Sequence, residues 1–368
     1  MNRIIDFLKK EIVLSVSFVL ALISMFFVPP SEKYFDYIDF RTLGLLFSLM
    51  TIMAGLNKMG IFRLLAKNLL NKAKTMRGVT LLLVSLCFFS SMLITNDVAL
   101  ITFVPFSVVL LKLANKQNRM IFVVTFETIA ANLGSMLTPI GNPQNLYLFS
   151  AYNMSISDFF YTIAPYAMLS LGLLVIFSLF SDKSELANLG DREEVIFDKR
   201  LLTMYAVLFA IALLSVFRVL NYIVLLAVVI VFVLIFDRKV LLKVDYSLLF
   251  TFVFLFIFIG NLGNIAQINS WLSEIVGGNE VVVGVLASQV FSNVPAAILL
   301  SGFTCNAAAL MIGVNIGGLG TLIASMASLI SFKFIQKESV SIAKYLGVFT
   351  LLNVVFLAAN LALWVVVK

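Results

Sequence analysis

The sequence predicts an all-α, polytopic membrane protein, and three observations carry this prediction. Apolar residues make up 61% of the 368-residue chain and charged residues only 12%, whereas soluble domains are close to half apolar and a quarter charged. Apolar runs long enough to cross a bilayer recur from one end of the chain to the other. These runs are continuous, unlike the short alternating strands of an outer-membrane barrel. A soluble enzyme with a single anchor is therefore excluded.

Basic residues lie mainly at the ends of the apolar runs, and they account for the net charge of +7. Because cytoplasmic loops of membrane proteins carry an excess of Lys and Arg, this pattern indicates orientation in the bilayer and no nucleic-acid partner. Arg3, Lys9 and Lys10 predict a cytoplasmic N-terminus, and the last span then leaves the C-terminus outside. We expect a multi-pass protein of a bacterial-type cytoplasmic (inner) membrane, with the lipid bilayer as its surroundings.

About nine spans are predicted from the apolar runs and the charges that flank them. They cover residues 11–28, 42–56, 120–150, 159–180, 201–217, 222–236, 248–262, 307–332 and 346–367. Between the second and third spans, the basic stretch from Lys58 to Arg77 predicts an interfacial helix on the cytoplasmic face. Residues 182–200, which are rich in Asp and Glu, predict a cytoplasmic linker loop.

Two further apolar segments predict re-entrant helical hairpins. Residues 78–111 contain no Lys or Arg, end beside basic residues, and carry the polar string Thr95-Asn96-Asp97 near their centre. A polar tip at membrane depth is tolerated where it lines a cavity, which favours a hairpin over two full spans. Residues 281–303 predict a second hairpin, whose tip is Ser292-Asn293.

The N-terminal half (1–181) and the C-terminal half (201–368) resemble each other locally. Asn132-Leu133-Gly134 in the third span pairs with Asn315-Ile316-Gly317 in the eighth at a separation of 183 positions, and the same register joins Thr138 to Thr321. Both spans are interrupted by glycines, and the flanking charges make the two hairpins enter from opposite sides. The sequence thus predicts an inverted-topology repeat with two re-entrant hairpins and two broken transmembrane helices, as is typical of secondary transporters.

Polar groups cluster at the hairpin tips and helix breaks, although unpaired polar groups are costly in hydrocarbon. Hydroxyl, amide and carbonyl oxygens are ligands for a hard cation such as Na⁺, and amides and helix N-termini can donate to an anion. The candidate Na⁺ ligands are Thr95, Asn96, Asp97, Gly141, Ser292, Asn293 and Ala324. The candidate substrate-binding residues are Asn96, Asp97, Thr138, Asn142, Asn145, Asn293, Thr321 and Ser325. The alternative interpretation is that these side chains only bridge packed helices.

Two acids, Asp97 and Glu127, lie within apolar runs, and their counterparts in the second half are Val294 and Leu310. An intramembrane acid predicts a cation ligand or a proton carrier, so both are candidates for proton coupling. The chain has no His, and no Lys or Arg lies deep in a predicted span. No cofactor is expected beyond Na⁺ or H⁺ as the coupling ion, and a bound Na⁺ would neutralise an anionic substrate.

Three strings carry a resemblance to a known family. ITNDVALITFVPF (94–106), GSMLTPIGNPQNL (134–146) and SNVPAAILL (292–300) resemble the ion transporter superfamily with citrate-transporter-like domains. That superfamily includes divalent anion/sodium symporters, arsenite permeases and a group of sodium/proton antiporters. In its sodium symporters, paired Ser-Asn-Thr tips bind Na⁺ and substrate carboxylates, so the resemblance implies this role for the tip residues Asn96 and Asn293. It also implies a homodimer.

At the third tip position this chain has Asp97 and Val294 in place of Thr, and the Asn-Asp pair looks closer to the arsenite permeases. We therefore predict a secondary active transporter of a small anion, a carboxylate or an inorganic oxyanion, coupled to Na⁺ or H⁺ by alternating access. An arsenite/antimonite-type efflux permease and a sodium/proton antiporter remain as alternatives. A channel is disfavoured because no ring of pore-lining groups repeats. An enzyme is disfavoured because no nucleophile–base pair or second positioned aspartate is found.

Overall fold

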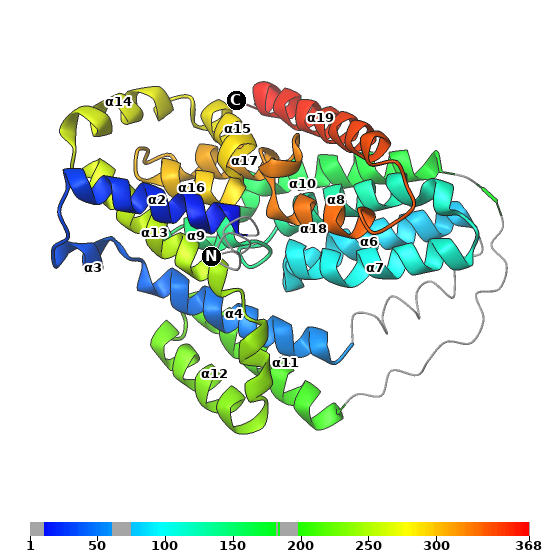
Figure 1. The fold of residues 1–368 in the computed structure, drawn as a ribbon, viewed down its shortest axis with the longest axis horizontal. Helices are drawn as coiled ribbons and strands as arrows, with labels where there is room; N and C mark the ends of the chain where they lie inside the picture. The colour runs from blue at the N-terminus through cyan, green and yellow to red at the C-terminus, as the bar shows by residue number, and fades with distance from the viewer. Residues whose placement is uncertain (1–10, 61–74, 182, 185–197, 368) are drawn as a thin grey trace, which may run out of the picture.

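The computed structural model describes residues 11–60, 75–181, 183–184 and 198–367, and in this part of the chain the regular structure is helical (Figure 1). Seven of the described helices are long and apolar enough to cross a membrane. They are α4 (Phe40–Lys58), α6 (Met76–Ile94), α7 (Asn96–Leu113), α10 (Ile156–Leu179), α11 (Lys199–Val216), α13 (Tyr246–Gly263) and α19 (Ile342–Val367). The predicted all-α polytopic class is confirmed.

Shorter helices complete the predicted spans and connect them. The apolar α2 (Ile12–Phe27) and α12 (Tyr222–Phe236) have 16 and 15 residues, so they extend over about 24 and about 22 Å, less than the thickness of a bilayer core. The connecting elements are α3 (Lys33–Tyr37), η1 (Gln117–Arg119), η2 (Arg238–Lys243) and α14 (Ala266–Val276). Most of the predicted interfacial helix and linker loop lies outside the described residues.

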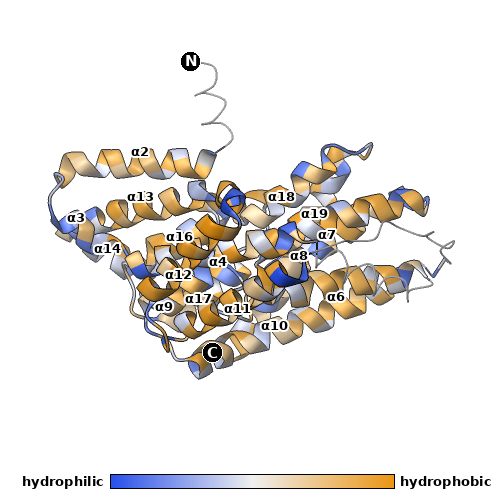
Figure 2. Ribbon diagram, turned by 90° about the horizontal axis from the view of Figure 1, so that it is seen from below, coloured by the Kyte–Doolittle hydropathy of each residue, from blue (hydrophilic) through white to orange (hydrophobic). Residues whose placement is uncertain are grey.

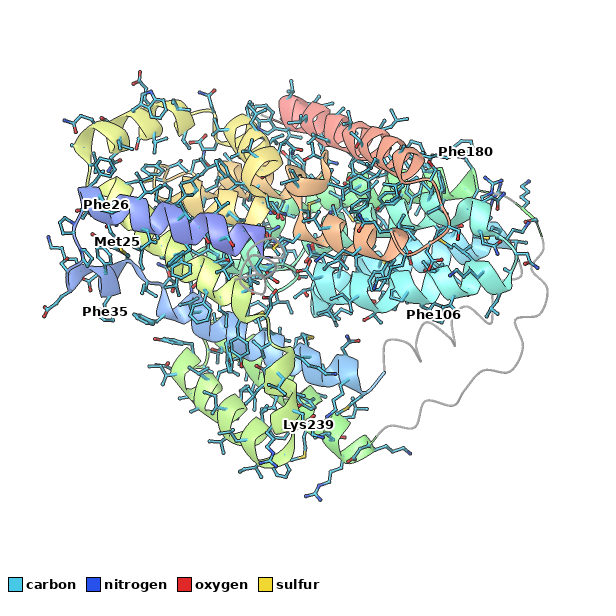
Figure 3. The ribbon with its side chains drawn as sticks, in the orientation of Figure 1. Met25, Phe26, Phe35, Phe106, Phe180 and Lys239 are labelled. Carbon is cyan, nitrogen blue, oxygen red and sulfur yellow. The ribbon has the colours of Figure 1, made fainter. Side chains whose placement is uncertain are left out.

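Helix surfaces in Figure 2 are hydrophobic over most of their length, and hydrophilic residues concentrate at helix ends and loops. Large apolar side chains project from the rim of the molecule, among them the labelled Phe26, Phe35 and Phe180 in Figure 3. Phe26 is 88% exposed and Phe180 is 81% exposed. Exposed aromatic surface on this scale is expected of a protein whose perimeter faces lipid.

Each predicted hairpin corresponds to two helices that meet at a single residue. In the first pair each helix is long and apolar enough to cross a membrane, so its predicted re-entrant course stays a prediction. The first consists of α6 and α7, which join at Thr95 with φ 71° and ψ 153°. The second consists of α15 (Glu280–Phe291) and α16 (Asn293–Ser301), which join at Ser292 with φ 73° and ψ 154°. A positive φ is uncommon for a residue other than glycine, so the two tips share an unusual backbone conformation.

Both predicted breaks are present in the helices that follow the hairpins. The first broken span consists of α8 (Met120–Ser135) and α9 (Pro143–Ala151). The second consists of α17 (Ala307–Ile316), the short η3 (Leu322–Ala324) and α18 (Met326–Ile335). The break after α8 is favoured locally because Asn142 caps α9 through its side chain and Pro143 occupies the first helical position.

The centre of the molecule is the region where the breaks and tips meet. α8 packs against α6, α7, α10, α18 and α19, and α9 packs against α4 and α16. In Figure 1 the first hairpin occupies the right half of the molecule and α16 the left half, while α4, α11 and α12 form a group below. An ion pair between Lys58 and Asp237, with 2.7 Å between Nζ and Oδ1, connects the end of α4 to the end of α12.

Candidate functional site

The tip of the first hairpin is bound to the first broken span. Asn96 is buried; its backbone N–H donates to the Gly141 carbonyl at 3.1 Å and its side chain donates to Asn132 Oδ1 at 3.3 Å. The Thr138 hydroxyl donates to the Met92 carbonyl, one turn before the tip. These contacts bring the predicted site residues Asn96, Thr138 and Gly141 together.

Asn132 connects this first tip to the second broken span. Its Oδ1 accepts from the Ser325 hydroxyl at 3.0 Å, and its Nδ2 donates to the Ser328 hydroxyl at 3.5 Å. Ser325 follows Ala324 at the end of η3, and both residues are buried. The predicted residue Ser325 is thus part of the same cluster as Asn96, although they are 229 positions apart in the sequence.

Asn315 connects the second broken span to the first break. Its Oδ1 accepts from Asn142 Nδ2 at 3.2 Å, and its Nδ2 donates to Asn145 Oδ1 at 2.7 Å. The Asn145 amide in turn donates to the carbonyls of Met136 and Thr138, at 2.9 and 3.2 Å. Both predicted asparagines of the break loop therefore lie at the contact between the halves.

The contacts of Asn132 and Asn315 follow one pattern. Each asparagine accepts through Oδ1 from one residue and donates through Nδ2 to another residue three positions further on, in the opposite half. The accepted partners, Ser325 and Asn142, are 183 positions apart, as are Asn132 and Asn315 themselves. The register found in the sequence therefore recurs in the hydrogen bonds of the centre.

The second tip is packed against the glycine-rich loop of its own broken span. The Gln289 amide donates to the carbonyls of Gly317 and Leu319 at 2.8 and 2.9 Å, and its Oε1 accepts from the Thr321 N–H at 3.0 Å. Asn293 is buried, and a Cβ at Gly318 would lie 2.8 Å from Asn293 Nδ2, so a larger residue at position 318 would displace the Asn293 amide.

Ser292 and Gln144 are the polar residues of the tips and break loops whose side chains each have a buried oxygen without a partner among the described residues. Ser292 is 2% exposed, and its hydroxyl has no hydrogen-bond partner in this part of the chain. A buried polar atom without a partner costs about 1–3 kcal/mol, so its retention requires an explanation such as a ligand, an ion or a water. The predicted residue Thr321 lies nearby but is exposed, and Gln289 contacts only its backbone.

Asp97 lies in the first turn of α7, where a negative charge is favoured by the helix N-terminus. Its side chain is half-buried. The carboxylate of Asp245, the N-cap of α13, lies close enough to repel a negative charge on Asp97. The ion pairs among the described residues are Lys58–Asp237 and Lys112–Glu338, so neither of them neutralises Asp97. The carboxyl group is thus placed at the tip with a second acid as its electrostatic neighbour.

Glu127 is separated from the tip residues. It is fully buried on α8, where Oε1 accepts from the Ser107 hydroxyl and from Cys87 Sγ, the latter at 3.9 Å. Its Oε2 has no partner in the described structure. No hydrogen bond between described residues connects Glu127 with the asparagine cluster, so the two candidate proton carriers occupy different environments.

From the sequence, Asn132, Asn315 and Gln289 belong to the two clusters of polar groups in apolar runs, but they are not selected as site residues. An asparagine at the same register position of both broken spans is a signal that could have selected Asn132 and Asn315. Gln289 has no such counterpart, because the residue at the corresponding place in the first hairpin is Met92, which contributes only its backbone carbonyl.

Comparisons with known proteins find membrane transporters among the relatives of this chain. A family described as citrate transporter matches residues 4–309. An uncharacterized transporter of Methanocaldococcus jannaschii is 32% identical over 350 residues, which is 94% of this chain and 95% of the relative. The inner membrane protein YbiR of Escherichia coli is 32% identical over 84% of this chain and 83% of its own length. The silicon efflux transporter LSI3 of Oryza sativa subsp. japonica is 32% identical over 43% of this chain and 32% of its own.

Proposed function

The chain belongs to the citrate transporter family and is a multi-pass membrane transporter, and we propose that it moves a small anion across the cytoplasmic membrane by secondary active transport. The proposed substrate is a carboxylate or an inorganic oxyanion, and the proposed coupling ion is Na⁺ or H⁺. The N-terminus is cytoplasmic and the C-terminus external in this proposal, as the distribution of Lys and Arg predicts.

The observation that carries this proposal is the unpartnered Ser292 hydroxyl at the second hairpin tip. At membrane depth, irregular backbone is tolerated only where it is buried in protein or lines a water-filled cavity. Ser292 lies in such a region, where the hairpin tips and helix breaks meet. Hydroxyl and amide oxygens of Ser292 and Asn293 are suitable ligands for Na⁺. The Asn96 amide, whose Nδ2 donates to Asn132 and keeps a second N–H, is a suitable donor to an anion. Asn142 becomes one when its bonds to Ser135 and Asn315 are released.

Alternating access is supported by the repeated contacts of Asn132 and Asn315. Two halves that hold each other through equivalent residues can exchange conformations, and an inverted repeat then opens the centre to opposite sides. The two sets of contacts are unequal, because Asn315 donates at 2.7 Å whereas Asn132 donates at 3.5 Å. In the proposed cycle the two asparagines exchange roles, so that Asn132 makes the short hydrogen bond in the other conformation and Asn315 the long one.

Asp97 favours a second candidate function, the efflux of a neutral metalloid hydroxide such as arsenite. An ionised Asp97 would repel a carboxylate at the same tip, whereas a neutral polyhydroxylated substrate is compatible with it. The names of two partial relatives, a silicon efflux transporter and a putative transporter arsB of Dictyostelium discoideum, are consistent with this candidate. In this mechanism Asp97 carries the exchanged proton.

Reconstitution of the full chain into liposomes tests the two candidates. Uptake of labelled citrate, phosphate and arsenite is measured under an imposed Na⁺ gradient, an imposed H⁺ gradient, or neither. We expect saturable uptake of citrate or phosphate that depends on one of the two gradients. Gradient-dependent movement of arsenite alone would replace the anion proposal by the efflux candidate, and non-saturable flux of every probe would contradict both.

A further inference from the structure

A cavity of about 360 Å³ lies beside α9, at the face of the molecule that the charges predict to be external. Its walls are formed by the residues around the start of α4, by the second half of α9 and by Phe256 of α13. Among the lining side chains are Tyr37, Asp39, Arg41, Tyr147 and Ser150. The cavity is therefore open at one end of the broken span that carries Asn142 and Asn145.

Arg41 is the cationic side chain in this cavity. Its only hydrogen bond to a described residue runs from Nη2 to the Ser215 carbonyl, and at 3.4 Å this contact is long. A guanidinium has five N–H donors, so most of its donor capacity is available to a ligand in the cavity. Planar donors of this kind match carboxylates and oxyanions.

The neighbouring carboxylate does not use Arg41 as its partner. Asp39 caps α4: its Oδ1 accepts from the Thr42 N–H at 2.9 Å and its Oδ2 accepts from the Thr42 hydroxyl at 2.5 Å. Both carboxylate oxygens are thus engaged within their own helix. No ion pair joins Asp39 to Arg41 among the described residues.

A second arginine reinforces the positive charge. Arg218, in the turn between α11 and α12, donates from Nη2 to the Phe149 carbonyl at 3.0 Å and lies 5.5 Å from the centre of the Phe149 ring. It lies close enough to Arg41 for their charges to interact. Arg218 does not itself line the cavity, and the lining residues carry one cation, Arg41, and one anion, Asp39. With Arg218 beside it, the Arg41 end of the cavity is the positive end, and a low-dielectric wall strengthens its field.

One wall of the cavity is formed by Tyr147 of α9, the helix whose first turn carries Asn145. Tyr147 lies two positions after Asn145 on α9, and its hydroxyl forms a 2.7 Å hydrogen bond with the Ser301 hydroxyl at the end of α16. This contact closes the space between the first broken span and the second hairpin. The cavity therefore ends against the two elements that would have to separate to admit a substrate to Asn145.

We propose that this cavity is an anion-recruiting vestibule, in which Arg41 binds a small carboxylate or oxyanion before it passes Tyr147 and reaches the central asparagines. The vestibule rests on the proposed function in one respect, that the substrate is an anion. Its charge selectivity, however, is a property of the folded protein and can be measured without transport.

The test compares an anionic and a cationic thiol reagent at the cavity wall. Ala151 is exposed and lines the cavity, so Ala151→Cys is made in a Cys305→Ser background, which removes the exposed native thiol. At each cysteine we measure the ratio of two reaction rates, that of the anionic methanethiosulfonate ethylsulfonate over that of the cationic trimethylammonium reagent. This ratio should be higher at Ala151→Cys than at the control Ser270→Cys on α14. Adding Arg41→Gln should lower this ratio at Ala151→Cys by about threefold or more, and 1 M salt should remove most of the difference.

Two further variants separate an effect of charge from an effect of misfolding. Arg41→Lys keeps the charge, and Arg218→Gln removes the second arginine. The first should preserve the ratio and the second should lower it partly, with each variant eluting as a monodisperse peak in gel filtration. An unchanged ratio after both charge removals, or an equal change at Ser270→Cys, would overturn the vestibule.

Uptake measurements separate this inference from the proposed function. If citrate or phosphate is transported, Arg41→Gln should raise its KM several-fold from the external side with little change in kcat. If an anion is transported and Arg41→Gln alters neither its KM nor the reagent ratio, the vestibule alone is rejected. Absence of anion transport with an Arg41-dependent ratio rejects the proposed function, and leaves the cavity as an anion-binding site that does not supply a transported substrate.

Discussion

Asn315 donates a 2.7 Å hydrogen bond to Asn145, and this contact joins the two broken spans at their breaks. Both side chains are buried, and each makes further bonds: Asn315 to the Met311 carbonyl and Asn145 to the carbonyls of Met136 and Thr138. A buried amide network of this kind favours one relative position of two helices, because separating them leaves polar atoms unpaired until they find new partners.

Replacing Asn315 tests whether this contact sets the relation of the halves. Asn315→Ala leaves Asn145 Oδ1 and Asn142 Nδ2 without these contacts, so we expect about 1–3 kcal/mol of destabilisation and a large loss of coupled uptake. The matched control is Asn353→Ala on α19, which removes a buried amide that donates to the Phe349 carbonyl of its own helix. Thermal unfolding in detergent and liposome uptake measure both effects; equal results for the two variants would contradict the prediction.

Ser292 is predicted to act through its free hydroxyl and not through packing. Ser292→Ala removes a hydroxyl that binds no described residue, so the fold should be as stable as wild type while coupled uptake is lost. Ser288→Ala, one turn earlier, removes a hydroxyl that donates to the Gly284 carbonyl at 2.7 Å and should leave uptake nearly unchanged. Wild-type uptake in Ser292→Ala would show that the second tip is only a packing feature.

The first break requires glycine at position 141. A Cβ there would lie 2.0 Å from the Ser135 carbonyl oxygen, which is backbone and cannot move away cheaply. Gly141→Ala should therefore cost about 1–3 kcal/mol or more and displace the carbonyl that holds the Asn96 N–H. Gly172→Ala on α10 is the control, since nothing lies within 4 Å of its added Cβ. Comparable unfolding temperatures for the two variants would argue against this account of the break.

The predicted orientation can be tested with the native cysteine at position 305. Cys305 is exposed and follows the second hairpin, whereas Cys87 is buried. A membrane-impermeant thiol reagent should label Cys305 in intact cells. The same reagent should not label the thiol introduced by Lys112→Cys in the Cys305→Ser background, because that position is predicted to be cytoplasmic. Labelling of Cys305 only from the cytoplasmic side would reverse the second half and remove the inverted repeat.

Much of the fold could be predicted from the sequence because apolar length and charge placement are strong signals in membranes. The sequence predicts the second hairpin at 281–303 and its helices run from Glu280 to Ser301, since a polar Ser-Asn pair interrupts an apolar run there. Helix ends differ by a few residues: α4 begins at Phe40 and not at residue 42, because Asp39 caps it and lets it start earlier.

The site was less predictable, because its contacts join residues far apart in the chain. Spacing could select Asn142 and Asn145 on a break loop, but it could not show that Asn315 holds both. Arg41 gives no signal either, since one arginine at the start of a span has the pattern of an ordinary interfacial charge. Its significance depends on Asp39 being engaged by Thr42 and on Arg218 lying nearby, and neither is visible in sequence.

Asp97 provides the most direct measurement of the central claim, that the first tip couples substrate movement to an ion gradient. Asp97→Asn keeps the shape of the side chain and a carbonyl oxygen, but removes the negative charge and the group that can bind a proton. In liposomes, we predict that this variant still exchanges labelled for unlabelled substrate across the membrane but no longer accumulates it under an imposed Na⁺ or H⁺ gradient. Gradient-driven accumulation at the wild-type rate would contradict the account.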